Sequence, residues 1–197
     1  MMGKWLKRIE LEGDLVRLIP LQLDHKEQLI AAADDGELWN LWFTSVPSKD
    51  SIDEYIESAL NSFHYDNGLP FAVVDKQSNK IIGTTRFLNV TSMHRRVEIG
   101  ATWYAKSFQK TGVNTECKYL LLKYAFEELK CIAVEFRTHW HNHASRNAIA
   151  RLGAKQDGIL RNHQIGLDGT LRDTVVFSIV RDEWDVIKKS LLFKMKR

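Results

Sequence analysis

The sequence predicts a mixed α+β fold that is built on one mostly antiparallel sheet. Three apolar segments in residues 71–104 follow one another with hairpin-length turns, which is typical of an antiparallel meander. The hydrophobic period then changes from two to about 3.6 over residues 115–129, which indicates an amphipathic helix. An apolar strand follows at 132–138, and the order strand, turn, helix, strand implies one parallel pair of neighbours. A doubly wound fold is therefore not expected.

The first part of the chain reads as one strand and two helices. Residues 15–19 are apolar with one charge and form the expected first strand. Helices are expected over 24–33 and 52–63, where apolar residues recur at helical spacing. Each helix start shows the pattern of a capping box, Asp24 with Glu27 and Ser51 with Glu54.

The remaining segments alternate strands with helices. The meander supplies three expected strands, at 71–74, 81–87 and 96–104. After the strand at 132–138, a helix is expected over 144–152, because Gly153 suits the residue that follows a helix end. The last expected elements are strands at 158–165 and 171–180, the turn Asp168-Gly169 between them, and a closing helix at 182–192.

Composition places the chain among ordinary globular proteins. Hydrophobic residues make up 44% and charged residues 27%, which excludes global disorder. The formal charge of +3 comes from 28 basic and 25 acidic residues that are interleaved, so we expect no nucleic-acid partner. No apolar run approaches the roughly 20 residues that span a bilayer, and Cys117 and Cys131 suit a reducing compartment. We therefore expect a cytoplasmic protein without a membrane partner.

The most informative segment is a glycine turn between the last meander strand and the long helix. A helix start exposes unpaired N–H groups and a partial positive charge, and Gly112 lets a ligand approach the backbone. With the hydroxyls of Thr111 and Thr115, these groups suit an anion such as a diphosphate. An ordinary helix cap explains the same residues, with Asn114 or Thr115 as N-cap and Gly112 for a tight turn.

Four segments form a specific pattern when they are taken in order. They are the loop Gln109-x-x-Gly112-x-Asn114, the strand Glu98 to Trp103, Asn142-x-x-Ser145 followed by Leu152-Gly153-Ala154, and Asp168-Gly169 with Arg172-Asp173-Thr174 and Glu183-Trp184. Over roughly residues 12–185 the sequence resembles the GNAT acyltransferase superfamily and, within it, the ribosomal-protein N-acetyltransferase (RimJ/RimL-like) branch. The family usually has glycine or alanine where this loop has Asn114.

The resemblance implies both the fold and the reaction. It implies a single N-acetyltransferase domain over residues 1–197, with a GNAT-like fold, one splayed parallel strand pair and helices on both faces of the sheet. The implied reaction moves the acetyl group of acetyl-CoA directly to a primary amine, on a peptide or protein N-terminus or a small metabolite. It implies no metal, and it leaves a homo-oligomer open.

The resemblance also assigns the cofactor-binding residues. The loop that would hold the diphosphate comprises Gln109, Lys110, Thr111, Gly112, Val113, Asn114 and Thr115. The pantetheine arm would pair with the backbone near Thr102, Trp103 and Tyr104 and with Asn142. Ser145 would lie near the thiol, as a proton donor to the leaving thiolate. Asn142 can also simply cap the following helix. Asn114 tolerates the left-handed region, so the loop can form, and its side chain can crowd the phosphate or donate to it.

Glu98 is the candidate general base, through a water, because its strand is otherwise apolar and burial raises the pKa of a carboxyl group. A carboxylate that faces solvent or is paired with Arg95 and Arg96 explains the same residue equally well. A histidine of the run His139-Trp140-His141-Asn142-His143 is an alternative base. Histidines at i and i+2 share a strand face and can meet one metal ion, although rim histidines are the commoner case.

Other residues and rival functions stay open. Trp39, Trp42 and Phe43 form either an aromatic lid over the acceptor or part of the core. Arg86, Arg137 and Arg161 lie on expected strands and can bind an acidic acceptor. The rival functions are a CoA-binding sensor without turnover and a nucleic-acid-binding protein, the latter suggested only by the pI of about 8.8.

Overall fold

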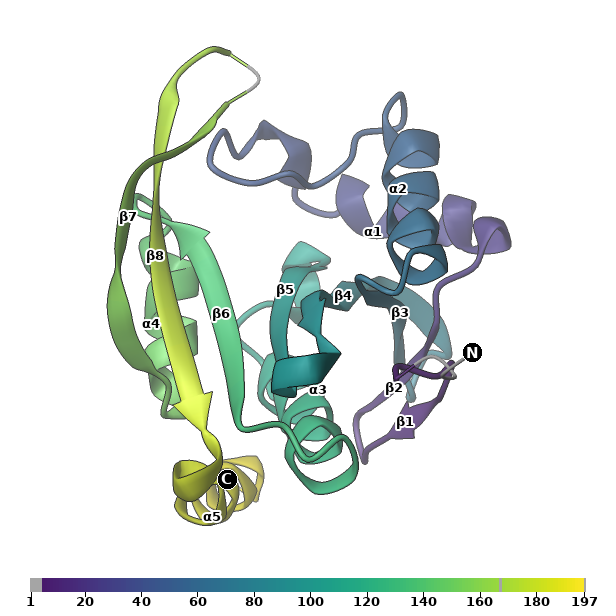
Figure 1. The fold of residues 1–197 in the computed structure, drawn as a ribbon. Helices are drawn as coiled ribbons and strands as arrows, with labels where there is room; N and C mark the ends of the chain where they lie inside the picture. Colours follow the sequence, from purple (N-terminus) through teal and green to yellow (C-terminus); the bar gives the residue numbers. More distant parts are fainter. Residues whose placement is uncertain (1–4, 167, 197) are drawn as a thin grey trace.

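The computed structural model describes residues 5–166 and 168–196, and its centre is one mixed sheet of eight strands (Figure 1). Across the sheet the strands are β1 (Leu11–Glu12), β2 (Val16–Pro20), β3 (Leu69–Asp75), β4 (Lys80–Thr91), β5 (Arg96–Tyr104), β6 (Ala133–His139), β8 (Leu171–Val180) and β7 (Lys155–Ile165). All neighbours pair antiparallel except β5 and β6, so the predicted α+β fold is confirmed.

The parallel pair is joined only at its beginning. Pairing between β5 and β6 runs from Arg96 with Ala133 to Glu98 with Glu135 and then stops. Beyond Glu98 the two strands diverge, as Figure 1 shows, while β5 stays paired with β4 as far as Tyr104. The predicted splay is confirmed, and it leaves the edge of β5 from residue 99 to 104 without a strand partner on the β6 side.

Helices cover both faces of the sheet, as predicted. One face carries α1 (Lys26–Asp34) and α2 (Ile52–His64), and the other carries α3 (Val113–Lys123), α4 (His143–Leu152) and α5 (Trp184–Met195). Each face has its own apolar cluster. Leu29 and Ile56 pack with Ala72 on the first face, whereas Leu121 and Leu191 pack on the second. The helices of the first face lie over β2 to β4 and contact β5 at Trp103, whereas no described residue of β6 or β8 belongs to the apolar cluster beneath them.

Several local predictions at helix starts are wrong. A 3-10 turn (Leu23–His25) precedes α1, and His25 Nδ1, not Asp24, accepts a hydrogen bond from the Gln22 amide at 3.2 Å. At α2, Ser51 Oγ accepts from the Ser48 amide at 3.0 Å and does not cap its own helix. At both helix starts, the side chain next to the helix therefore accepts a hydrogen bond from an amide of the preceding turn, not from an amide of the helix. The helix predicted over 115–129 begins at Val113 instead, and after Lys123 it continues as a π turn (Tyr124–Glu128).

The two cysteines are free thiols in the core. Cys117 and Cys131 are both fully buried. Burial raises the pKa of each thiol, and for Cys131 the value is about 12. Neither thiol is suited to act as a nucleophile at neutral pH. No helix within 5–166 or 168–196 combines the length and the apolar character needed to cross a membrane.

Candidate functional site

The glycine turn lies at the beginning of α3, on the side of the sheet where β5 and β6 diverge. Lys110 adopts a left-handed conformation with φ of 61°, and this residue turns the chain toward the helix. Gly112 is the N-cap with φ of −66°, a value that any residue can adopt. The conformational freedom of glycine is therefore not needed here, and what distinguishes Gly112 is that it has no side chain above the turn. A Cβ atom at Gly112 would lie 2.8 Å from the Leu15 side chain.

The first turn of α3 presents free donors. Among the described residues, the amides of Gly112, Asn114 and Thr115 have no hydrogen-bond partner. The Val113 amide donates to Thr111 Oγ1 at 3.3 Å, so one donor is already used. The reading of Asn114 or Thr115 as N-cap is wrong, because both lie inside the helix. Three free amides at the positive end of a helix are donors of the kind that an anion accepts from.

A pocket of about 410 Å³ borders this turn. Thr111, Gly112 and Thr115 line it together with two cations from the last helical turns of α4 and α5, Arg151 and Lys194. Arg151 donates to Thr115 Oγ1 at 2.6 Å, and Lys194 donates to the Arg151 carbonyl at 2.5 Å. These contacts hold two positive charges beside the free amides, and the sequence pattern did not point to either cation.

Glu116 connects the start of α3 to the sheet. This carboxylate is 5% exposed and accepts hydrogen bonds from the amides of Asp14, Leu15 and Val16, at 2.8, 2.7 and 2.8 Å. Three charge-assisted bonds fix the turn between β1 and β2 against α3. The residue was missed from sequence, because a glutamate in a first helical turn is ordinarily explained by the helix dipole alone.

Asn114, which departs from the family pattern, points its side chain toward the sheet. Its Oδ1 accepts from the Tyr104 hydroxyl at 3.3 Å, and Gln109 Nε2 donates to the Tyr104 carbonyl at 3.0 Å. Asn114 lies in a right-handed helix, so the expectation that it needs to tolerate a left-handed conformation is wrong. The side-chain oxygen of Asn114 is thus hydrogen-bonded to Tyr104 of β5.

The free edge of β5 carries the three residues that were expected to meet the pantetheine arm. Trp103 and Tyr104 are buried side chains, 7% and 6% exposed, so only their backbone is offered at the edge. Trp103 Nε1 donates to the Tyr55 hydroxyl at 3.1 Å, which anchors the strand to α2. Thr102 Oγ1 lies 2.7 Å from Thr85 Oγ1 on the α3 side of the sheet.

Lys118 is a buried cation that the sequence analysis did not single out. It extends from α3 to the sheet, where its Nζ donates to the hydroxyls of Thr85 and Thr102, at 3.2 and 2.5 Å. The side chain is 5% exposed, and burial lowers the pKa of Lys118 to about 8. In the sequence, Lys118 lies among the apolar residues of an amphipathic helix, and nothing there indicates that it contacts threonines of the sheet.

Asn142 and Ser145 begin α4 at the open end of the splay. Asn142 Oδ1 accepts from the Ser145 amide at 3.0 Å, so the expected helix cap is present. Within the described part of the chain, the Asn142 side-chain amide and the Ser145 hydroxyl have no partner. The cap therefore leaves both of these groups available to a ligand.

Glu98 lies on β5 at the last paired position, on the face that also carries α1 and α2. It is 6% exposed, and its Oε2 accepts from Asn89 Nδ2 at 2.7 Å and lies 3.4 Å from Arg137 Nε. Burial raises the pKa of Glu98, although Asn89 and Arg137 oppose this effect. The alternative of a solvent-facing carboxylate is wrong, and the cation that pairs with it is Arg137, not Arg95 or Arg96.

The end of β6 forms the opposite wall with an aromatic cover. The ring of Trp42, 64% exposed, lies 5.0 Å from the ring of His139 and 5.6 Å from that of His141. Trp39 instead packs against the cluster under α1, as the core alternative predicted, whereas a lid role for Trp42 stays a prediction. Burial, with Arg172 and His141, lowers the pKa of His139. No cluster of three metal-ligating residues occurs in 5–166 or 168–196.

Known proteins with related sequences are acetyltransferases. The family model of the acetyltransferase (GNAT) domain matches residues 16–155. YdaF of Bacillus subtilis (strain 168), a protein named provisionally as a ribosomal N-acetyltransferase, is 29% identical over 149 residues, 74% of this chain and 78% of its own. The [ribosomal protein uS5]-alanine N-acetyltransferase of Escherichia coli (strain K12) is 25% identical over 131 residues, 64% of each chain.

A solved structure agrees with the fold over nearly the whole chain. A GCN5-related N-acetyltransferase from Brucella melitensis superposes with a TM-score of 0.88 and 30% identity. The match covers 98% of this chain and 87% of the other.

Proposed function

The chain belongs to the GNAT acetyltransferase family, and on that premise we propose how its residues bind acetyl-CoA and an amine. The protein is an acetyl-CoA-dependent N-acetyltransferase. The observation that carries the assignment of residues is the coincidence of two features at one end of the sheet. These are the free amides that begin α3 and the unpaired edge of β5.

The diphosphate of acetyl-CoA binds at the turn from Gln109 to Thr115. The free amides of Gly112, Asn114 and Thr115 donate to the phosphate oxygens, and the helix dipole favours the negative charge. Lys110 adds a cation to the same turn. The Asn114 side chain stays with Tyr104 and leaves the backbone of the turn accessible.

The pantetheine arm extends from that turn into the splay. Backbone groups of Thr102, Trp103 and Tyr104 pair with its amides as a missing strand would, because this edge of β5 has no strand partner. The Asn142 side chain binds the arm from the α4 side. This arrangement places the thioester between β5 and β6, next to Glu98 on one face and Ser145 at the start of α4.

Two side chains move protons in the transfer. Glu98 removes a proton from the ammonium through a water, which frees the nitrogen lone pair to form the new N–C bond. As the C–S bond breaks, the Ser145 hydroxyl donates a proton to the leaving thiolate and regains one from the acetylated nitrogen, which loses its second proton as the amide forms. The raised pKa of Glu98 suits a base that works near neutral pH.

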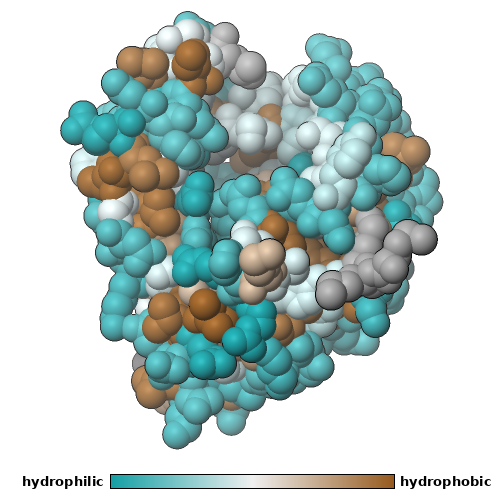
Figure 2. Space-filling view, in the orientation of Figure 1, coloured by the Kyte–Doolittle hydropathy of each residue, from teal (hydrophilic) through white to brown (hydrophobic). Residues whose placement is uncertain are grey.

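The acceptor is a primary amine that approaches from the face carrying Glu98. Relatives are named for ribosomal protein acetylation, so an N-terminal amine of a peptide or protein is one source, and a small metabolite is the other. Figure 2 shows the surface hollowed between the β7–β8 hairpin and α2, which gives an amine access to this face.

Thiol release from acetyl-CoA tests the proposal when it is measured against a panel of amines and alanine-starting peptides. We expect turnover with at least one amine, and a large loss in Glu98→Gln and in Ser145→Ala while CoA affinity is unchanged. Unchanged turnover in both variants would contradict the assigned roles. Thiol release that no amine stimulates would favour a CoA-binding sensor.

A further inference from the structure

Three arginines lie on the face of the sheet that carries Glu98. Arg86 on β4 pairs with Gly100, two residues beyond Glu98 on β5, while Arg137 lies two residues beyond Glu135, the β6 partner of Glu98. On β8, Val176 is opposite Arg137, and Arg172 follows on the same face because strand side chains alternate. We call Arg86, Arg137 and Arg172 the arginine triad.

Two members of the arginine triad have a buried donor without an acceptor. The Nε atoms of Arg86 and Arg172 are buried without a hydrogen-bond partner in the described structure, as is that of Arg17 on β2. Arg137 Nε makes no hydrogen bond either, but it lies 3.4 Å from Glu98 Oε2 in an ion pair. Arg86 is 7% exposed as a whole residue. Buried donors are ordinarily paired, so the free Nε–H groups of Arg86 and Arg172 lack an acceptor that a ligand can supply.

The carboxylates on this face do not balance its cations. Glu135 accepts from both Arg96 and Arg137, and Glu98 lies 3.4 Å from Arg137 Nε. Arg86 has no carboxylate partner among the described residues; its guanidinium stacks 4.2 Å above the Tyr55 ring and donates to the Tyr55 carbonyl at 3.5 Å.

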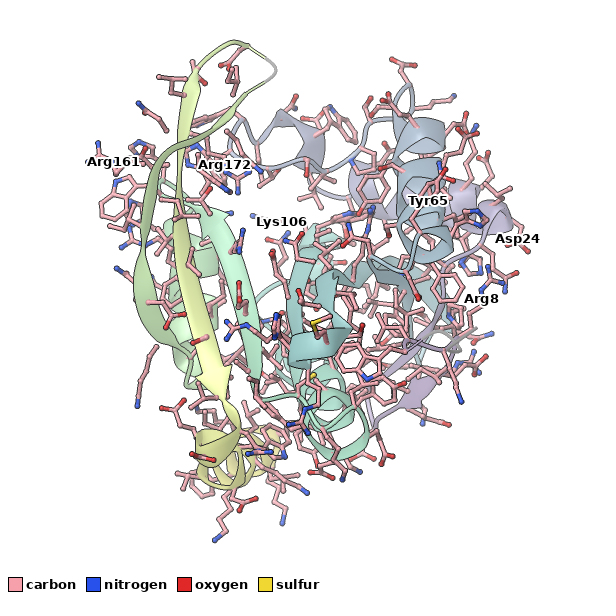
Figure 3. The ribbon with its side chains drawn as sticks, in the orientation of Figure 1. Arg8, Asp24, Tyr65, Lys106, Arg161 and Arg172 are labelled. Atoms are coloured by element: carbon pink, nitrogen blue, oxygen red, sulfur yellow. The ribbon has the colours of Figure 1, made fainter. Side chains whose placement is uncertain are left out.

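Arg172 is the second cation without an ion pair. Within 5–166 and 168–196, no carboxylate lies within ion-pair distance of Arg172, although the charge of Glu98 acts on it. Figure 3 shows Arg172 on the side of the β7–β8 hairpin that faces the segment between α1 and α2, whereas Arg161 lies on the outer side. Arg161 is paired there with Asp173 at 2.5 Å. Of the three arginines that the sequence analysis grouped, Arg161 thus lies apart from Arg86 and Arg137, on the outer side of the hairpin.

We propose that the acceptor carries a carboxylate a few bonds from its reactive amine, and that Arg86 and Arg172 bind this carboxylate while the amine faces Glu98. The inference rests on the proposed function and specifies the acceptor class of the same site. Arginine binds a carboxylate through two parallel N–H donors, which supplies the missing acceptors and fixes the amine relative to its base. A free amino acid and a peptide with an acidic side chain near its N-terminus both present this chemistry.

Matched acceptors that differ only in the carboxylate test the proposal. The first pair is alanine and alaninamide, and the second is the peptide amides Ala-Glu-NH₂ and Ala-Gln-NH₂. We expect kcat/KM to be higher for the acid by about tenfold or more in one pair, because the neutral analogue leaves buried donors unpaired. A preference within the first pair assigns a free amino acid, and one within the second assigns an acidic N-terminus. Equal kcat/KM within both pairs would overturn the inference but leave the acetyltransferase intact.

Variants connect the preference to the arginines. Arg172→Gln and Arg86→Gln are expected to lower kcat/KM for the acid to the level of its amide, with the KM for acetyl-CoA unchanged. Arg172→Lys and Arg86→Lys serve where a glutamine variant does not fold, and we expect a partial loss because lysine cannot donate bidentately. Arg161→Gln is the matched control and should keep the full preference. A preference that survives at both triad positions would contradict the inference, and absence of thiol release with every amine would overturn the proposed function as well.

Discussion

We propose Glu98 as the base, so its environment sets the pH dependence that we expect for the reaction. Burial raises its pKa, and the carboxylate acts as a base only when it is deprotonated. We therefore expect kcat/KM to rise with pH through a pKa above the usual range of a glutamate. In Glu98→Gln this acidic limb should disappear, and kcat should fall by about 10²-fold.

Glu135→Gln is the control for this prediction. Glu135 is opposite Glu98 on β6, and its charge raises the pKa of Glu98. The limb should persist in this variant and move to lower pH. A pH profile of Glu98→Gln that keeps the wild-type limb would show that another group is the base, with His139 and His141 as the candidates at the end of β6.

Lys118 gives a stability prediction at the same scale. Its pKa is about 8 in the folded protein against 10.5 for an ordinary lysine, so the folded state disfavours the charged form. The resulting penalty is complete below pH 8, is relieved between pH 8 and 10.5, and is absent above that range. Lys118→Met should therefore stabilise the protein at pH 7 by roughly 1–3 kcal/mol.

Urea unfolding of Lys118→Met and wild type at several pH values measures this effect. The threonine hydroxyls that Lys118 contacts are already 2.7 Å apart, so they can satisfy each other in the variant. The difference in unfolding free energy should shrink as the pH rises toward 10.5. A difference that is independent of pH would contradict a charged, buried Lys118.

At the residue scale, the sequence predicted the positions of side chains whose partners lie within the same short motif. Asn142 and Ser145 lie where the pattern placed them, because both belong to one helix start. Arg172, Arg151 and Lys118 were not found, because each acquires its meaning from a distant strand or helix that packs against it. Long-range packing of this kind leaves no periodic signal in the chain.

At the scale of elements, the start of α3 is the critical structure. A side chain at Gly112 would meet the end of the Leu15 side chain, which can move, so the fold should tolerate a substitution there. The same side chain would block a phosphate from the free amides. We expect Gly112→Val to weaken CoA binding by about tenfold or more, as measured by calorimetry.

Gly158→Val on β7 is the matched control, because a Cβ atom there meets no other atom within 4 Å. CoA affinity should be unchanged in this variant. If Gly112→Val binds CoA as wild type does while its circular dichroism is unchanged, the diphosphate does not lie on this turn.

Glu116→Gln tests the attachment of the same helix to the sheet. The variant replaces a carboxylate that accepts from three backbone amides, so it should lower the unfolding free energy by roughly 1–3 kcal/mol. Thermal unfolding measures the loss. Glu12→Gln, which removes an exposed ion pair with Lys76, should change stability far less.

The elements themselves were predictable where hydrophobic period was clear. The long strands and five helices agree with their predicted ranges to within a few residues, since each buries one face or stripe. Short elements escaped prediction: β1 has two residues, and the 3-10 turns such as Leu38–Asn40 are held by local backbone bonds without a pattern. The helix predicted to end at residue 129 ends as α3 at Lys123 and continues as a π turn. The π turn keeps the helical spacing of apolar residues but has i to i+5 hydrogen bonds, so the sequence pattern did not reveal it.

At the scale of the whole molecule, one sheet separates two tasks. One face is covered by α3, α4 and α5, and the turn that we assign to the cofactor lies at the start of α3. The opposite face carries Glu98 and the arginine triad, which we assign to the acceptor. The gap that opens between β5 and β6 beyond Glu98 connects the two faces of the sheet. That residues 1–197 form one domain stays a prediction, as does a homo-oligomer.

The most direct test of this account is a crystal structure of the protein with CoA. We predict that the diphosphate lies on the amides of Gly112, Asn114 and Thr115, with the pantetheine arm along the free edge of β5 and the sulfur between Glu98 and Ser145. Density for the diphosphate at another surface, with the first turn of α3 empty, would contradict the central claim.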